Sequence, residues 1–221
     1  MRNFRAPTPF FTAGIAVMTA ALGGCAGHMD YARPTTHAEA GSNVVVISKS
    51  RDAVWASAVP ELSKRFFVVN NLDKASGFIN LSYSGDPEKY VDCGRVTSFV
   101  KNARGERTYE FAGSTAQKSY EVLNPGGLFF IDRRMSLEGR VNLVFEEVSP
   151  TETRVTANTH YVVTRHSTAR AASNNNTGSS TDTIAFNSGS SAAFPIGAGQ
   201  TVATECTPTG VLEQDILSAM K

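Results

Sequence analysis

The 221-residue chain is long enough for one or two domains. Its 41% hydrophobic content lies well above the range of disordered chains, and 21 basic residues balance 20 acidic ones. A chain with no basic excess has no electrostatic footprint for nucleic acid, and without a polybasic stretch it has no electrostatic membrane anchor. We therefore expect no nucleic-acid partner.

The first 24 residues have the layout of an export signal. Two arginines and no acid form a positively charged start, an apolar run covers 10–22, and Gly23 and Gly24 close the segment. The apolar stretch, about 15 residues, is shorter than the roughly 20 that cross a bilayer. We therefore expect segment 1–24 to be a signal peptide and not a transmembrane anchor. Its removal leaves 19 basic against 20 acidic residues.

The end of this segment carries a second pattern. Leu22-Gly23-Gly24-Cys25 resembles the lipobox of bacterial lipoproteins. The resemblance implies that the Cys25 sulfur receives a diacylglycerol, that a peptidase cuts before it, and that the new amino terminus is acylated. Three acyl chains would then hold the protein on a membrane, its first expected partner. Ala26, and not Asp, follows the cysteine, which by the sorting rule of enteric lipoproteins implies the outer membrane, facing the periplasm.

Residues 25–42 show no apolar periodicity and contain Pro34, Gly41 and Ser42. Such a composition is typical of a linker, so we expect a lipidated flexible tether that holds the folded part away from the bilayer. We expect one folded domain over 43–221.

The folded part begins with a β-branched strand at 44–47. Ser50 then offers a helix start, and apolar residues at helical spacing continue to about Arg65. Pro60 should kink or shorten this helix, because a proline removes one backbone hydrogen bond. Trp55 lies on the apolar face, where a large aromatic side chain serves mainly as a core anchor.

Antiparallel strands dominate the middle of the chain. The strongest signal is a hairpin over 135–145 and 154–164, in which apolar residues alternate with polar ones, so that one face of the sheet contacts water. Further strands are predicted at 66–69, 78–83 and 90–100.

The last quarter is predicted to be less regular. Residues 165–182 are polar and of low complexity, which favours a long disordered loop. Pro208 suits the first turn of a final helix, with Thr207 as its N-cap. Strands with segregated helices predict an α+β fold: one mainly antiparallel sheet with an early helix and a C-terminal helix on one face.

Three cysteines in an exported chain leave one thiol to explain. Lipidation accounts for Cys25. We therefore expect Cys93 and Cys206 to form a disulfide, which persists in the periplasm.

Few residues suggest chemistry. Arg133 and Arg134 follow an apolar run and predict either a carboxylate or phosphate site with paired guanidinium groups, or a strand edge protected by charge. His160 and His166 are the only histidines of the expected domain and are too few for a zinc site. No catalytic, phosphate-loop or dinucleotide motif occurs. We expect no enzyme activity, no metal and no cofactor.

A second resemblance spans Ser50 to Ser84. The helix-grip domains of a lipoprotein component of the outer-membrane β-barrel assembly machinery share a strand, a Trp-containing helix and two strands of similar pattern. The matching residues here are Val54-Trp55, Phe67-Val68-Val69, Asp73, Gly77-Phe78-Ile79 and Tyr83. The resemblance implies a helix-grip-like domain with an assembly role.

Three functions follow as hypotheses. The first is a noncatalytic interaction or assembly module for other envelope proteins, which the absence of catalytic motifs favours. The second is a carrier of a small ligand or lipid, which an apolar groove with convergent polar groups would favour. The third is a hydrolase with an unrecognised site, which would need a nucleophile beside a base.

Overall fold

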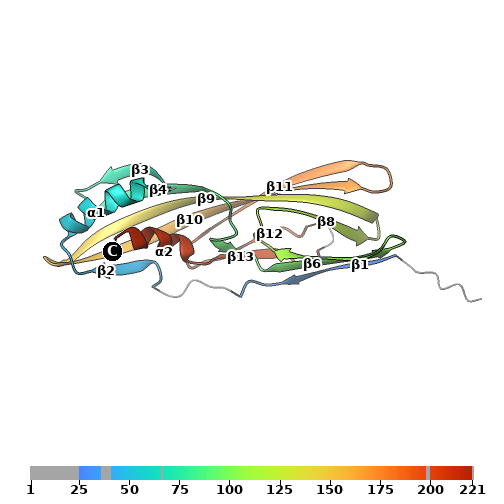
Figure 1. Cartoon of the computed structure of the whole chain (residues 1–221), viewed down its shortest axis with the longest axis horizontal. Helices are drawn as coiled ribbons and strands as arrows, with labels where there is room; N and C mark the ends of the chain where they lie inside the picture. Colours follow the sequence, from blue (N-terminus) through green and yellow to red (C-terminus); the bar gives the residue numbers. More distant parts are fainter. Residues whose placement is uncertain (1–24, 36–40, 66, 198–199, 221) are drawn as a thin grey trace, which may run out of the picture.

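The computed structural model describes residues 25–35, 41–65, 67–197 and 200–220. Two long antiparallel strands, β9 (Gly127–Ser149) and β10 (Glu152–Ala171), form the axis of an elongated molecule (Figure 1). At 3.3 Å per residue, the 23 residues of β9 span roughly 75 Å. The predicted hairpin is therefore confirmed and is much longer than its alternating segment, because β9 and β10 pair along nearly their whole length.

Different strands flank the two halves of this hairpin in one seven-stranded sheet. One half pairs with β2 (Val44–Ile47) and β4 (Phe78–Gly85), and β3 forms the edge beyond β4. The other half pairs with β8 and β11. Strand β3 covers Val68–Asp73, β8 covers Gln117–Asn124 and β11 covers Thr177–Asn187.

Both helices pack with the long hairpin in one hydrophobic core. Helix α1 (Arg51–Ser63) begins at Ser50, whose hydroxyl accepts a hydrogen bond from the Ala53 amide, and it buries Trp55 edge-on against Phe145. Trp55 is therefore the predicted core anchor. Pro60 lies inside the helix, three residues before its end.

The C-terminal helix starts later than predicted. Helix α2 (Val211–Leu217) is capped by Gly210, whose φ of +79° favours glycine, and continues into η1 (Ser218–Met220). The predicted N-cap, Thr207, instead lies in strand β13 (Thr204–Pro208), where it pairs with Asp92. The strand can include Pro208 because β12 pairs only with residues 204–206, so that at Pro208 the strand has a neighbour, β5, on one side and is an edge on the other.

Two small antiparallel sheets accompany the large one, so the described residues form an α+β fold with three sheets and not the single sheet predicted. One contains β1 (Ala26–Ala32), β6 (Arg95–Asn102) and β7 (Gly105–Ala112). The other contains β12 (Ala192–Phe194), β13 and β5 (Val91–Asp92).

Strand β1 replaces part of the predicted flexible tether. Its seven residues pair with β6 from Ala26 opposite Lys101 to Ala32 opposite Arg95. The segment is mostly exposed, so backbone pairing and not apolar burial orders it, and hydropathy could not reveal it.

The predicted disordered loop at 165–182 is also ordered. Its residues form the β10–β11 hairpin, paired from Arg165 opposite Asp182 to Arg170 opposite Thr177. Serine and threonine side chains cover this ribbon without building a core, so the polar composition was a poor guide to backbone order.

The predicted signal peptide, 1–24, lies outside the described residues, whereas Cys25 is described, exposed and not disulfide-bonded. Among the described residues, no helix has the length and apolar character needed to cross a membrane.

Candidate functional site

A cavity of about 380 Å³ lies where the large sheet faces β6, residues 195–197 and Gln200. Its volume falls within the range of small-molecule sites. Strands β8 to β11 provide its floor, because their inward-facing residues continue the face that forms the core nearer the helices. The apolar part of the lining is Val96, Ile131, Ala169, Pro195 and Ile196, and the polar part is Tyr120, Arg133, Arg165, Ser167, Ser179, Ser180, Asp182 and Gln200.

Arg133 is the unusual member of this lining. Its side chain is only 5% exposed, yet among the described residues no carboxylate pairs with it. Nη2 donates to the carbonyls of Ala112 (3.3 Å) and Thr115 (3.4 Å), and the guanidinium lies 4.9 Å from the Phe111 ring centre. Nε is buried and has no acceptor among the residues that the structure describes. A guanidinium carries five N–H donors, so this one keeps spare donors and an uncompensated charge.

Arg165, on the neighbouring strand, has a conventional partner. Nη2 donates to Asp182 Oδ2 at 2.9 Å and to the Pro195 carbonyl at 3.0 Å, and its guanidinium lies 4.6 Å from the Phe194 ring centre. With a single carboxylate for two arginines, the charged side chains lining the cavity have a net charge of +1. That excess resides on Arg133.

The electrostatics of the cavity reflect its burial. Desolvation lowers the pKa of Arg133, with a further decrease from the like charge of Arg165. Desolvation likewise raises the pKa of Tyr120, against the influence of both arginines. Tyr120 therefore carries a neutral phenol at physiological pH, and its hydroxyl is a potential donor to an anion.

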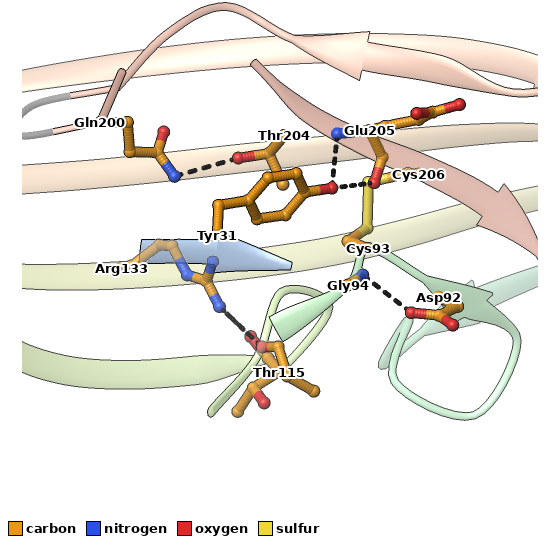
Figure 2. Close-up of a disulfide and its surroundings, with 11 residues drawn as sticks. Tyr31, Asp92, Cys93, Gly94, Thr115, Arg133, Gln200, Thr204, Glu205 and Cys206 are labelled. Carbon is orange, nitrogen blue, oxygen red and sulfur yellow. Dashed lines mark hydrogen bonds between the residues drawn. A yellow bond between two sulfur atoms is a disulfide. The ribbon is translucent and has the colours of Figure 1, made fainter. Parts of the chain in front are cut away.

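The disulfide predicted from the cysteine count is present. Cys93 and Cys206 are bonded across a sequence separation of 113 residues, with Cα atoms 4.1 Å apart. The bond fixes β13, whose first residue, Thr204, accepts a hydrogen bond from Gln200 of the cavity lining at 3.1 Å (Figure 2). The Gln200 side chain in turn accepts from the Gly197 amide at 2.9 Å. The disulfide thus holds one wall of the cavity.

Arg134 does not share this cavity. Adjacent residues of a strand point to opposite faces, so Arg134 is exposed on the other face and lines a separate, open depression together with His166. The predicted pairing of Arg133 with Arg134 is therefore wrong. The alternative of a charged edge is wrong as well, because β9 is flanked on both sides by other strands.

The two histidines lie on the outer face of the sheet. His160 is within 2.8 Å of Asn187, and His166 within 2.9 Å of Thr181. Among the residues that the structure describes, no group of three or more histidine, cysteine or acidic side chains could hold a metal ion.

Sequence reasoning missed Arg165, Asp182 and Tyr120 as neighbours of Arg133. Arg165 and Asp182 fell in the predicted disordered loop, and the β10–β11 register that brings them together was not visible. A usable signal existed in the alternation of β10. Arg165 lies an even number of residues after Val155, Tyr161 and Val163, so its side chain points to the same buried face.

A second groove, of about 600 Å³, lies near the helices, but its two lysines are already paired with carboxylates. Lys64 pairs with Glu61 and Lys89 with Asp215, at 2.6 and 2.5 Å, while Arg65 donates to the Asp215 carbonyl and to Ser218. Arg65 has no carboxylate partner among the described residues, but it is only half-buried, so water can solvate its charge, whereas Arg133 is buried. This groove therefore has less need of an incoming anion than the cavity at Arg133.

Comparisons of this chain with protein-family models, with curated proteins and with solved structures find no match.

Proposed function

We propose that this chain is an envelope lipoprotein whose domain binds, without catalysis, a small ligand that carries one carboxylate or phosphate group. Anchoring through Cys25 to the outer membrane, facing the periplasm, completes the proposal. The observation that carries it is the buried Arg133 guanidinium, which lines a cavity and lacks a carboxylate partner among the described residues.

A buried charge without a partner is costly, so a protein normally pairs or removes it. Arg165 with Asp182 shows the ordinary solution in the same cavity. An anion beside Arg133 would supply the missing counter-charge and accept from its spare donors, as carboxylates and phosphates commonly do. The apolar side chains of the lining suit a ligand with a hydrocarbon part next to its charged group.

On fold, we propose a helix-grip-like relationship for the part containing α1, β3 and β4. It is supported by the order strand, Trp-containing helix, strand, strand, and by the helix packing against the large sheet.

Binding can be tested with three probes that share one chain and differ in headgroup: octyl phosphate, octanoate and octanol. Calorimetry on the natively lipidated protein should show that at least one of the two anions binds. Arg133→Met should weaken that anion roughly tenfold or more, because a charge-assisted hydrogen bond is lost. Octanol should be affected much less.

Arg134→Met is the matched control, because it removes the same side chain from the adjacent position on the opposite face. It should bind like the wild type. Failure of both anions to bind, or equal weakening by both substitutions, would contradict the proposal.

Assembly with another envelope protein is the second candidate function. It is favoured by β3, an edge strand of the large sheet on which Val68 and Leu72 are 63% and 45% exposed. A partner retained in a mild-detergent pull-down by the wild type, but lost with Val68→Lys and Leu72→Lys, would support this function. Cys25→Ala is the control for membrane association.

A further inference from the structure

Strand β1 attaches Cys25 directly to the folded domain. Ala26, the next residue, already pairs with Lys101 of β6, so a single peptide unit of at most about 3.8 Å separates Cys25 from the ordered ladder. Lipid chains on Cys25 would therefore hold this end of the domain at the bilayer surface, with no spacer between them.

Three hairpin turns gather at the same end of the molecule, opposite α1 (Figure 1). The β6–β7 turn, 102–105, follows Lys101. The β8–β9 turn, 124–127, is adjacent to β1, since a Cβ built on Gly27 would lie 2.6 Å from Leu123 Cβ. The β10–β11 turn adjoins it, because the Ala172 amide donates to the Leu128 carbonyl at 2.9 Å.

We propose that these three turns form a membrane-contacting surface that lies on anionic phospholipid headgroups. The inference rests on the proposed lipidation of Cys25 and adds a fixed orientation to it: the long hairpin stands away from the bilayer with the helices at its far end. It replaces the flexible tether with a contact between domain and membrane.

The charges at this end fit an anionic surface. Lys101 pairs with Glu106 at 2.6 Å and Arg107 with Glu121 at 2.5 Å. Arg104 and Arg170 have no carboxylate partner among the described residues, so this end carries a local excess of positive charge.

An apolar component accompanies the charge. Arg170 lies over the half-buried Phe130 ring at 4.5 Å from its centre, beside the β8–β9 turn. An aromatic ring with a cation over its face suits the interfacial region of a bilayer. This orientation also places the cavity near the membrane, because the six residue-to-residue steps from Gly127 to Arg133 span roughly 20 Å.

Lysine labelling in vesicles tests this orientation without altering the fold. The natively lipidated chain is placed in vesicles of phosphatidylethanolamine and phosphatidylglycerol and treated with a water-soluble amine-acetylating reagent, and the rates are measured by mass spectrometry. Lys101 reports on the turns near Cys25, while Lys74, in the β3–β4 turn, reports on the far end; their side chains are 49% and 59% exposed.

The control variant carries a long Gly-Ser spacer between Cys25 and Ala26, which keeps the same lipid anchor and lifts the domain from the surface. Lys101 should react about fivefold or more slowly in the natural chain than in the spacer variant, with Lys74 unchanged. Replacing phosphatidylglycerol by phosphatidylcholine should weaken the protection. Equal Lys101 rates in the two chains would overturn the orientation, and protection independent of lipid charge would overturn the role of anionic headgroups.

Failure of the anchor is distinguishable from failure of the orientation. A chain that carries no acyl groups by intact mass and does not float with vesicles overturns the lipidation, and this orientation with it. A lipidated, floating chain with fully reactive Lys101 overturns the orientation alone. Binding of the octyl probes does not depend on either result.

Discussion

Tyr31 and Glu205 lie 174 residues apart and are joined by two hydrogen bonds through one hydroxyl group (Figure 2). Tyr31 Oη donates to the Glu205 carbonyl at 3.0 Å and accepts from the Glu205 amide at 2.9 Å. The hydroxyl thus satisfies both backbone groups of a β13 residue next to the disulfide. It links β1, and therefore the proposed lipid anchor, to the strand that holds the cavity wall.

Tyr31→Phe should lower the free energy of unfolding by about 1–3 kcal/mol, because it leaves two backbone groups of Glu205 without their partner. Urea unfolding monitored by circular dichroism measures the change. Tyr109→Phe is a suitable control, since within the described part of the chain the Tyr109 side chain bonds to the side chain of Arg107 and to no backbone group. A cost for Tyr31→Phe no larger than that of the control would show that the link is unimportant.

The paired substitution Cys93→Ala with Cys206→Ala removes a cross-link that closes a loop of 113 residues. The chain-entropy model gives a loss of about 4–5 kcal/mol for a loop of this length, and measured values are often smaller. Urea unfolding should therefore shift to a clearly lower midpoint. Reduction of the wild type by a thiol should reproduce the shift, and an unchanged midpoint in both would contradict the stabilising role.

The sequence was informative wherever a residue pattern directly determines structure. Alternation over 135–145 and 154–164 predicted the central hairpin, because a strand with one buried face must repeat every two residues. Helical spacing after Ser50 predicted α1, and an odd cysteine count, in a chain that we expect to be exported, predicted the pair Cys93–Cys206.

The remainder depended on neighbours that the sequence does not reveal. Strand β1 is mostly exposed and β11 is mostly polar, and each is ordered by pairing with a partner strand and not by its own hydrophobicity. The cavity depended on the same information. Arg133 and Arg134 looked like a pair because they are adjacent, whereas the true neighbour of Arg133 is Arg165, 32 positions later in the sequence, through the β9–β10 register.

Arg133 and Arg165 should differ in their contribution to stability. Arg133→Met removes a buried charge that lacks a carboxylate partner, so it should cost at most about 1 kcal/mol of unfolding free energy or even stabilise the unliganded protein. Arg165→Met leaves Asp182 unpaired and should cost about 2–3 kcal/mol. Thermal and urea unfolding measure both, with Arg134→Met as the surface control. A loss for Arg133→Met as large as that for Arg165→Met would mean that Arg133 is structural, not a ligand-binding group.

Alkaline pH should destabilise the fold through its buried tyrosines. Burial raises the pKa of Tyr120, and burial together with the charge of Glu213 raises that of Tyr161, whose hydroxyl is 2.8 Å from both Glu213 carboxylate oxygens. A raised pKa in the folded state means that the folded chain retains protons that the unfolded chain releases. The corresponding stability is fully present below the unfolded pKa of about 10 and is lost as the pH rises above it.

The absorbance of phenolate and the far-ultraviolet circular dichroism, followed together in an alkaline titration, test this expectation. Part of the phenolate signal should appear only as the ellipticity is lost, because these two hydroxyls ionise on unfolding. Tyr161→Phe should remove some of that delayed signal and should also destabilise the protein near neutral pH, since the buried Glu213 carboxylate then loses one donor and retains the Ser188 hydroxyl at 2.7 Å. Complete ionisation of all tyrosines near pH 10 with unchanged ellipticity would refute the burial of these groups.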